Sequence, residues 1–314
     1  MSYNILLTAI GSFSADCVVR ELKKEGHKII GCDIYPSEWH AVSKDCFSVY
    51  RAPLAVNKVE YITFIREICK KENVQLVYPL TDIEIDVFNE YRSVFEEDNI
   101  LLCMPGQEFL SCARNKYNLY KTFVNDINVP SIATYLSQDK NMPLLLPSIA
   151  KPFNGRSSEG LFRIFTEEEF ENIKNKSGYI IQKMIQGPVF TVDYIRSSKY
   201  NKDFSVAREE LLRTKNGAGT TVRITCDSKL TELVSYIGRS LNLNGVVNME
   251  FIKNENNYYL IDVNPRFSAG VAFSVKAGYN MVLNSLNCYT GKNIDLPCNI
   301  HESIMIKRYY EEIL

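Results

Sequence analysis

The sequence predicts a parallel α/β domain followed by a mixed α+β region. Three observations favour this fold class. The chain opens with a strand, helix, strand pattern over residues 5–33, short strands and long polar loops follow Pro105, and two alternating runs flank a turn within 248–266. Its 314 residues exceed what one compact core usually serves, so we expect two or three packed units.

The first 105 or so residues have the pattern of a small doubly wound domain. Apolar runs predict strands at 5–10, 28–32, 74–78 and 100–104. Amphipathic stretches between them predict helices at 15–25, 61–71 and 83–95. Strands that alternate with helices in this way indicate a parallel sheet.

The turn after the first strand, residues 8–15, lacks the three spaced glycines of a dinucleotide fingerprint, although Asp33 ends the second strand. A redox enzyme with a nicotinamide cofactor is therefore disfavoured. We interpret these strand ends as structural. The alternative is that they form part of a substrate pocket, with Thr81 and Asp82 among its residues, since ligands of such sheets bind at the carboxyl ends of strands.

After Pro105 the predicted elements are less regular. A helix is expected at 114–125 and strands are expected at 149–152, 161–165, 179–181 and 190–195. Thr166 followed by Glu169 predicts a capping box, in which the threonine hydroxyl and the glutamate side chain bond the free amides of a helix start.

Composition excludes several classes of function. With 36 Lys+Arg against 37 Asp+Glu the chain lacks the basic excess of a nucleic-acid or anionic-membrane binder. Nine scattered cysteines without a CxxC pair suit a reducing compartment better than a disulfide framework or a zinc site. The start of the chain resembles no signal peptide, and no apolar run is long enough for a membrane span. We expect a cytoplasmic protein without a nucleic-acid or membrane partner.

A lysine-and-glycine segment at 150–161 is the first candidate for chemistry. Lys151 closes a strand, and a loop of small residues with Gly155 and Gly160 follows. Backbone amides in such a loop approach phosphate oxygens closely, and the lysine supplies a compact positive charge. The alternative is a polar hairpin turn with an incidental lysine, because no Walker motif is present.

The second candidate is the predicted hairpin at 248–266. Asp262 and Asn264 share one face of its second strand by the two-residue period. Glu250 joins that face if the register pairs it with Asp262, which requires a bulge or an odd loop, such as three residues at 255–257. Three hard oxygen ligands on one face suit magnesium, and Arg266 just beyond suits a phosphoryl group. The alternative is a solvated polar face.

Taken together, these segments resemble the ATP-grasp superfamily, specifically carboxylate-amine ligases similar to the ATP-binding modules of the carbamoyl-phosphate synthase large subunit. The resemblance covers nearly the whole chain. It implies a Rossmann-like domain at 1–105 that precedes an ATP-grasp domain at 106–314. The first lobe, about 106–185, would carry the phosphate loop, and the second lobe, about 186–314, the metal site.

The resemblance also assigns residues to roles. Lys116 and Lys151 stand at the two ATP-binding lysines, and the phosphate-loop positions are Gly155, Ser157, Ser158 and Gly160. The hinge that receives adenine corresponds to Gln182, Lys183, Met184 and Ile185, with backbone groups near Lys183 and Ile185 at its edge. The metal positions are Glu250, Asp262 and Asn264, and Arg266 is the arginine of the NPR signature. The cofactors implied are ATP and Mg²⁺, with Mn²⁺ as an alternative.

Two positions depart from the family pattern. Lys183 replaces a hinge glutamate, and Val189 replaces a glutamate that accepts hydrogen bonds from the ribose hydroxyls. Loss of that acceptor should weaken ATP binding by about 1–3 kcal/mol.

The segment 206–223 resembles the family's strand and loop that carry arginines toward the acceptor carboxylate, with Arg208 as the closest match. Arg208, Arg213, Lys215 and Arg223 would place positive charge opposite the acidic metal site, and Gly217 and Gly219 suit a mobile flap. The alternative is a strand with exposed basic residues. We expect Arg208, Arg213 and Arg266 to take part in catalysis.

The functional hypothesis is an ATP- and Mg²⁺-dependent ligase. It would join a carboxylate to an amine or another nucleophile through an acyl phosphate, with small molecules as its partners. The alternative is an ATP-binding regulatory or non-ligating protein of the same fold, which Val189 and Lys183 keep open. The identity of both substrates and the oligomeric state, a homodimer included, stay open.

Overall fold

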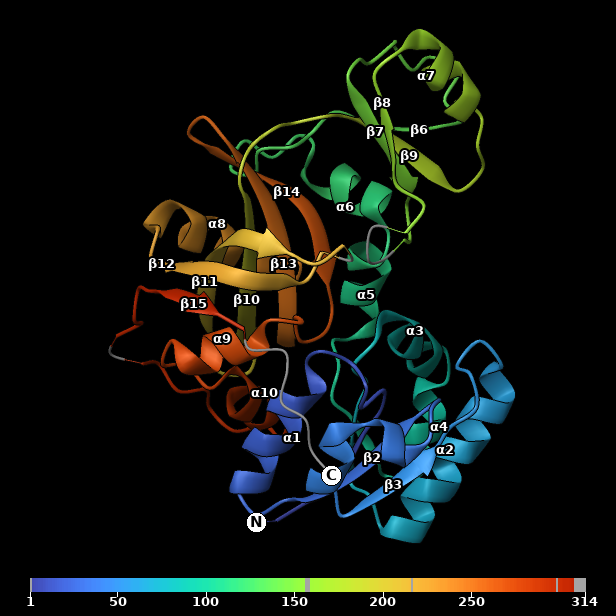
Figure 1. Cartoon of the computed structure of the whole chain (residues 1–314), viewed down its shortest axis with the longest axis vertical. Helices are drawn as coiled ribbons and strands as arrows, with labels where there is room; N and C mark the ends of the chain where they lie inside the picture. Colours follow the sequence, from blue (N-terminus) through green and yellow to red (C-terminus); the bar gives the residue numbers. More distant parts are fainter. Residues whose placement is uncertain (1, 156–158, 216, 298, 308–314) are drawn as a thin grey trace.

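The computed structural model describes residues 2–155, 159–215, 217–297 and 299–307. Within them the chain forms three β-sheets in sequence order. Figure 1 shows the first as the blue unit at the bottom, the second as the green sheet at the upper right, and the third as the yellow-to-red sheet at the left. Helices α5 (Gln107–Ala113) and α6 (Lys116–Phe123) lead from the first unit to the second.

The N-terminal sheet is parallel, with the strand order β3-β2-β1-β4-β5. Its strands are β1 (Asn4–Leu7), β2 (Lys28–Asp33), β3 (Ser48–Arg51), β4 (Leu76–Tyr78) and β5 (Leu101–Leu102). Its helices are α1 (Ala15–Lys24), α2 (Lys58–Glu72), α3 (Asp82–Glu90) and α4 (Arg92–Glu97), with 3-10 turns at Ser37–Trp39 and Ala41–Asp45. The central strands are buried on both faces, which explains why short apolar runs predict them.

Two elements of this unit differ from the expectation. The pattern does not indicate β3, which is short, lies at the sheet edge and has no fully buried residue. The helix expected at 83–95 is two helices, α3 and α4, because Tyr91 between them has a non-helical backbone (φ −106°, ψ 22°).

The second sheet is antiparallel, with the order β6-β9-β7-β8. Its strands are β6 (Thr134–Leu136), β7 (Ser148–Pro152), β8 (Phe162–Ile164) and β9 (Tyr179–Lys183), and α7 (Glu167–Ile173) covers it. The predicted capping box at α7 is confirmed. The Glu169 amide donates to Thr166 Oγ1 at 3.2 Å, and the Thr166 amide donates to Glu169 Oε2 at 3.1 Å.

The third sheet is also antiparallel and has the order β14-β13-β10-β11-β12-β15. Its strands are β10 (Val189–Ser197), β11 (Lys202–Arg213), β12 (Gly219–Thr225), β13 (Gly245–Asn254), β14 (Asn257–Asn264) and β15 (Ile304–Ile306). Three helices accompany it: α8 (Ser228–Ser240), α9 (Val271–Lys276) and α10 (Met281–Tyr289). The fold class is therefore confirmed as a parallel α/β domain followed by an α+β region with two antiparallel sheets.

The third sheet packs directly against the N-terminal unit through α10. Asn280, at the start of this helix, donates to Glu21 Oε2 on α1 at 2.7 Å. The Ser285 and Tyr78 hydroxyls lie 3.2 Å apart across the same contact. Buried residues of both units form continuous hydrophobic clusters, so the two units share an interior.

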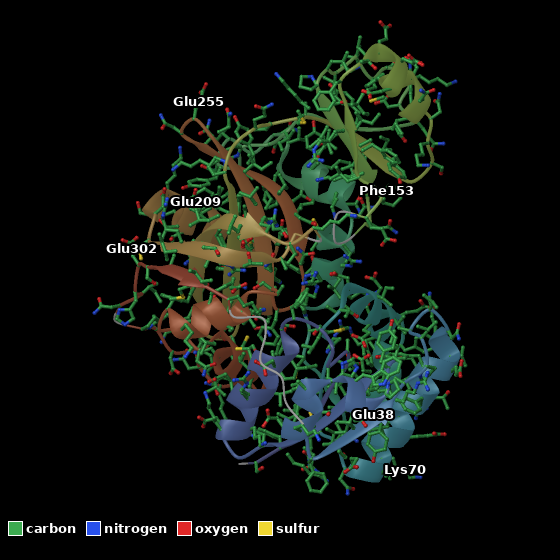
Figure 2. The ribbon with its side chains drawn as sticks, viewed as in Figure 1. Glu38, Lys70, Phe153, Glu209, Glu255 and Glu302 are labelled. Carbon is green, nitrogen blue, oxygen red and sulfur yellow. The ribbon has the colours of Figure 1, made fainter. Side chains whose placement is uncertain are left out.

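The β13–β14 hairpin pairs Glu250 with Asp262, as the metal hypothesis requires, and does so through a bulge rather than through a three-residue loop. Asn254 pairs with Asn257, so the loop is two residues rather than three, and Glu255 at its tip takes the left-handed conformation (φ 51°). The register then shifts between Glu250 and Phe251, which leaves Ile261 as a bulge. Figure 2 labels Glu255 at the outer end of this hairpin.

The described residues contain no helix with the length and apolar character needed to cross a membrane. The eight cysteines among them are all free thiols. Homodimer formation stays a prediction.

Candidate functional site

A row of polar residues crosses four strands of the third sheet. Thr191 on β10 pairs with Arg208 on β11 and, on its other side, with Glu250 on β13, which pairs with Asp262 on β14. Side chains at paired positions point to the same face of a sheet. Residues as far apart in the sequence as Thr191 and Asp262 are thereby brought to one surface.

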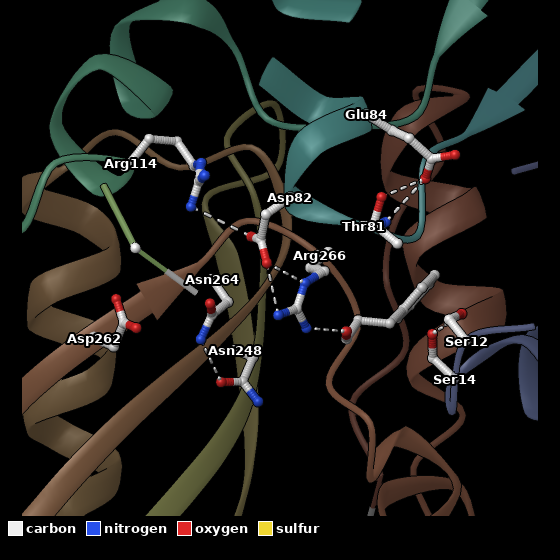
Figure 3. A network of polar contacts seen from close by, with 12 residues as sticks. Ser12, Ser14, Thr81, Asp82, Glu84, Arg114, Asn248, Asp262, Asn264 and Arg266 are labelled. Carbon is white, nitrogen blue, oxygen red and sulfur yellow. Dashed lines mark hydrogen bonds and ion pairs between the residues drawn. The ribbon is translucent and has the colours of Figure 1, made fainter. Parts of the chain in front are cut away.

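A second polar row runs beside the first. Asp193, Asn248 and Asn264 occupy paired positions two residues along β10, β13 and β14. Asn264 Nδ2 lies 3.4 Å from Asn248 Oδ1, and Figure 3 shows these two amides pointing toward each other. Glu250, Asp262 and Asn264, the three predicted metal ligands, therefore share one face.

This face fits a magnesium ion. Burial and the neighbouring Asp262 carboxylate raise the pKa of Glu250, against the opposing effect of Arg213. Two carboxylates that disfavour each other's charge are stabilised by a shared cation. No group of three His, Cys, Asp or Glu side chains among the described residues has metal-binding geometry. Magnesium does not need one, because it takes one or two carboxylates with phosphate and water oxygens.

The two predicted ATP-binding lysines meet this acidic edge from the other lobe. Lys116 Nζ is 3.1 Å from Asp262 Oδ1 and donates to the Gly155 carbonyl at 2.8 Å. Lys151 Nζ donates at 3.3 Å to the carbonyl of Ile261, the bulged residue. Burial, with a smaller contribution from Lys116, lowers the pKa of Lys151 to about 8.

The phosphate-loop prediction is described only in part. Ser157 and Ser158 lie outside the described residues. Gly155 is placed by its contact with Lys116, and Gly160 has a left-handed backbone (φ 70°) that an L side chain rarely adopts. A side chain at Gly160 would also collide with the Tyr179 hydroxyl.

Arg208 is buried inside an ionic cluster. Its Nη1 donates to Asp193 Oδ2 at 2.9 Å, its Nη2 to Ser268 Oγ at 2.9 Å and its Nε to Glu210 Oε1 at 3.2 Å. These carboxylates outweigh the effect of burial and raise the pKa of Arg208 above its usual value. All three guanidinium nitrogens thus have protein partners.

Arg266 belongs to a clamp between the two units. Its Nη2 is 2.8 Å from Asp82 Oδ2, although the residues are 184 positions apart. Arg114 approaches Asp82 from the other side, with its Nη1 3.4 Å from Oδ1 (Figure 3). Burial acts to raise the pKa of Asp82, but Arg266 and Arg114 outweigh it and hold the pKa below its usual value.

The other cations of the 206–223 segment divide between two environments. Arg213 Nη2 is 3.2 Å from Glu250 Oε2, so it reaches the metal face as expected. Arg223 pairs with Glu209 on the opposite face of β11 and is half exposed, and Lys215 is exposed. The structure brings Arg208, Arg213 and Arg266 together and leaves Lys215 and Arg223 as surface residues.

A cavity of about 390 Å³, here called the central cavity, lies between the N-terminal unit and the third sheet. The N-terminal unit contributes residues 11–14 and 80–82. The third sheet and the turn after it contribute polar side chains: Thr191, Arg208, Glu210, Arg213, Asn248, Glu250, Asp262, Asn264, Arg266 and Ser268. Asp82 is among these lining residues, as the alternative interpretation of the N-terminal strand ends anticipates.

Of the predicted hinge residues, Gln182 and Lys183 end β9 of the second sheet, and Met184 and Ile185 follow it. Gln182 is buried, and its Nε2 donates to Thr134 Oγ1 at 2.7 Å. The backbone amides of Lys183 and Met184 donate to Ala133 and Pro147, whereas Ile185 continues into the connection to β10. The gap beside Gln182 measures about 20 Å³, room for about one water molecule.

Sequence reasoning missed three polar residues of this cluster: Asp193, Glu210 and Ser268. The two-residue period places Glu210 on the same face as Arg208, so this signal is present in the sequence. Glu210 is 2% exposed, and its Oε2 has no hydrogen-bond partner among the described residues. Val189, which replaces the ribose acceptor, lies on the same strand face as Thr191 and supplies no acceptor group.

Comparison with known families and proteins gives concordant results. The ATP-grasp domain family matches residues 113–270, and the PylC-like N-terminal domain family matches residues 5–103. A protein of Methanocaldococcus jannaschii described as uncharacterised is 22% identical over 295 residues, which cover 88% of this chain and 72% of that protein.

Solved structures share the fold at low sequence identity. Biotin carboxylase of Campylobacter jejuni, in complex with βγ-ATP, has a TM-score of 0.79 and 16% identity, over 96% of this chain and 74% of that chain. N5-carboxyaminoimidazole synthetase of Staphylococcus aureus, in complex with ADP, has a TM-score of 0.74 and 15% identity over 97% and 80%. L-amino acid ligase of Bacillus licheniformis has a TM-score of 0.71 and 17% identity over 92% and 74%.

The family matches coincide with the elements described above. The ATP-grasp match begins at the end of α5, includes both lysines and the hairpin, and ends just beyond Arg266. The PylC-like match spans the parallel sheet from β1 to β5. Because the ATP-grasp match covers half of the chain, the protein belongs to the ATP-grasp family.

Proposed function

We propose that this protein is an ATP- and Mg²⁺-dependent ligase that joins a carboxylate to an amine through an acyl phosphate. One observation carries the proposal. The bulged hairpin sets Glu250 opposite Asp262, and the two lysines of the other lobe converge on the same edge, Lys116 on Asp262 and Lys151 on the Ile261 carbonyl. A cation pair beside a carboxylate pair suits a triphosphate and its metal.

The nucleotide would lie between the second and third sheets. Lys116, Lys151, Gly155 and Gly160 would face its phosphates, and the Lys183 carbonyl and Ile185 amide would face its adenine edge. The gap beside Gln182 is about 20 Å³, so the second sheet would have to move outward to admit a purine. Arg213 and Lys116, which contact Glu250 and Asp262, would lie within reach of phosphate oxygens.

Glu250, Asp262 and Asn264 would hold the metal. Magnesium bound there supplies charge neutralisation for the β- and γ-phosphates. The other contributions come from positioning and fixed charge, as in other phosphoryl transfers.

The reaction needs no protein nucleophile. A carboxylate oxygen of the acid attacks the γ-phosphorus, an O–P bond forms, and the bond to ADP breaks as ADP leaves. The amine nitrogen then attacks the acyl carbon, inorganic phosphate leaves, and the nitrogen loses a proton. Glu210 Oε2, buried and without a hydrogen-bond partner among the described residues, is the acceptor that we assign to that proton.

The arginines have different tasks in this scheme. Arg266 lies on the side of the central cavity that faces the N-terminal unit, where it would bind the acid and stabilise the acyl phosphate. Arg208 has three protein partners and its side chain is 2% exposed, against 19% for Arg266, so Arg208 would act through its charge and by holding Glu210 in place rather than by touching a substrate. Arg213 would contact the γ-phosphate during its transfer.

The second candidate is an ATP-binding protein of this fold that does not ligate. Val189 and Lys183 favour it, because both replace nucleotide-binding carboxylates. Purified protein with ATP, Mg²⁺ and a panel of acids and amines separates the two functions. The ligase releases ADP only when the correct acid is present. Thermal stabilisation by ATP without ADP release for any acid and amine pair would establish the second candidate instead.

A further inference from the structure

A second cavity of about 420 Å³, here called the N-terminal pocket, lies at the carboxyl ends of β1 to β4. Ala9 follows β1, Asp33 ends β2, Ala52 follows β3 and Thr81 follows β4. Most of its wall is apolar, through Ile34, Leu54, Ala55, Val56, Tyr61 and Ile83. Small-molecule pockets typically have this size and this apolar character, with a few polar groups.

The N-terminal pocket adjoins the central cavity. Gly11, Ser12 and Thr81 line both. Thr81 directly precedes Asp82, the carboxylate that holds Arg266. A molecule whose charged end lies beside Arg266 therefore has an apolar space next to its other end.

The acidic groups of this pocket are already occupied by protein donors. Asp33 accepts from the amides of Gly11 at 2.9 Å and Tyr35 at 3.1 Å, and His40 Nε2 lies 3.2 Å from its Oδ1. Glu84 accepts from the Tyr61 hydroxyl at 2.8 Å and from the Thr81 hydroxyl at 2.7 Å. Because these carboxylates serve the fold, the pocket offers a ligand chiefly apolar surface, and a charged group there would lose its hydration without a partner.

The entrance of the pocket is apolar as well. Tyr35 stacks on Trp39 with ring centroids 5.7 Å apart, and both side chains are more than half exposed. Leu54 and Val56 are 52% and 64% exposed. Apolar side chains gathered at the mouth of a cavity favour entry of an apolar ligand.

We propose that the N-terminal pocket binds the apolar body of the carboxylate substrate, whose carboxyl group lies in the central cavity beside Arg266. The acid is then a small molecule with a branched aliphatic or single-ring aromatic group. Arg266 indicates which of the two substrates this is: its contacts with Asp82 and the Phe267 carbonyl leave some of its five N–H donors unused, and these can bond a carboxylate but not an ammonium group. This inference rests on the proposed function.

The test measures ADP release with ATP, Mg²⁺ and hydroxylamine as the nucleophile. Phenylacetate, 3-methylbutanoate, leucine and phenylalanine are compared with glycolate, serine, aspartate and bicarbonate. We expect turnover with apolar acids at a KM at least about 10-fold lower than for polar acids of similar length.

Two kinds of variant locate the effect. Ala55→Leu narrows the pocket and should raise the KM for the apolar acid about 10-fold while the KM for ATP is unchanged. Ala41→Leu makes the same change at an exposed position outside the pocket and should leave both values unchanged. The double variant Leu54→Ala with Val56→Ala removes apolar side chains that line the pocket. Both positions are more than half exposed, so this variant provides the test if Ala55→Leu does not fold.

The outcomes separate this inference from the proposed function. ADP release that is equal for polar and apolar acids, or unaffected by the pocket variants, overturns the inference and leaves the ligase standing. A third outcome is that calorimetry detects binding of apolar acids, that Ala55→Leu weakens this binding, and that no acid causes ADP release. This outcome supports the pocket and overturns the ligase. If Leu54→Ala with Val56→Ala changes only the sedimentation behaviour, the surface binds a second copy and the inference is wrong.

Discussion

The central cavity and the N-terminal pocket share Gly11, Ser12 and Thr81, but the first has a charged lining and the second an apolar lining. The central cavity is lined by arginines and carboxylates that hold one another, such as Arg208 with Glu210 and Arg213 with Glu250. The N-terminal pocket is lined by aliphatic and aromatic side chains, and its carboxylates face backbone amides and hydroxyls. Fixed charge suits the phosphate chemistry, and apolar shape suits the choice of substrate.

If the charged side chains of the central cavity carry the chemistry, loss of the charges of Glu250 and Asp262 should abolish ligase activity. Glu250→Gln with Asp262→Asn should lower ADP release by about 1,000-fold, because the metal would lose both carboxylates. Mg²⁺ dependence of nucleotide binding, followed by calorimetry, should disappear as well. Glu255→Gln at the tip of the same hairpin is the matched control, since this side chain is exposed. Turnover in the double variant near that of the control would refute the metal assignment.

Asp82 joins the N-terminal unit to Arg266 beyond β14, so its loss should destabilise the fold. Asp82→Asn leaves Arg266 and Arg114 without their shared carboxylate and should lower the free energy of unfolding by about 3 kcal/mol in urea. The lowered pKa of Asp82 means that this stabilisation is present above about pH 4 and is lost as the pH falls through the native pKa. Asp86→Asn, which removes a half-exposed partner of Arg114, should cost much less. Equal losses would contradict the clamp.

Glu210 tests whether the central cavity also serves the amine. Glu210→Gln should lower kcat about 100-fold while the KM for ATP stays constant, because the proton acceptor is lost and the nucleotide contacts are kept. Glu209→Gln is the adjacent control, since Glu209 contacts Arg223 on the opposite face of β11. Figure 2 labels Glu209 on this sheet. A kcat that is unchanged in Glu210→Gln would remove this residue from the mechanism.

Lys151 should contribute a smaller, pH-dependent effect. Lys151→Met should weaken ATP binding about 10-fold, measured by calorimetry at pH 7. Because its pKa is lowered to about 8, wild-type affinity should fall as the pH rises from 7 to 9, and the variant should not follow. The buried charge lowers native stability below pH 8, a cost that is relieved between about pH 8 and 10.5. Lys140→Met, an exposed lysine of the same lobe, should resemble wild type.

The smallest effect is expected at the entrance of the N-terminal pocket. Leu54→Ala should change the free energy of unfolding by less than about 0.5 kcal/mol, because the side chain is half exposed. Leu6→Ala, fully buried in β1, should cost about 2–5 kcal/mol in the same urea titration. A large loss for Leu54→Ala would show that this side chain supports the core rather than a ligand.

Much of the fold and of the site can be read from the sequence. Buried strands such as β1 and β4 have apolar runs, and Asp262 and Asn264 share a face by the strand period. The α8 helix was also within reach, because Asp227 accepts from the Leu230 amide at its start and Leu230, Val234 and Ile237 follow the helical spacing. Its amphipathic pattern is the signal that our expectations leave out.

The hairpin shows where such reasoning fails. The pairing of Glu250 with Asp262 is correct, whereas the three-residue loop is wrong. A two-residue loop and a bulge at Ile261 give the same pairing. Local sequence does not distinguish these solutions, because the choice depends on neighbours such as Lys151, which donates to the Ile261 carbonyl from another sheet.

The sequence by itself determined the order of the motifs, the shared face of Asp262 and Asn264 and the family to which the chain belongs. Only the tertiary structure decided that Asp82 holds both Arg266 and Arg114, and that an apolar pocket adjoins a charged cavity. The physical reason is that these features arise where the N-terminal unit meets the third sheet. Burial there strengthens each charge pair, and the partners are too far apart in the chain for any local pattern to specify.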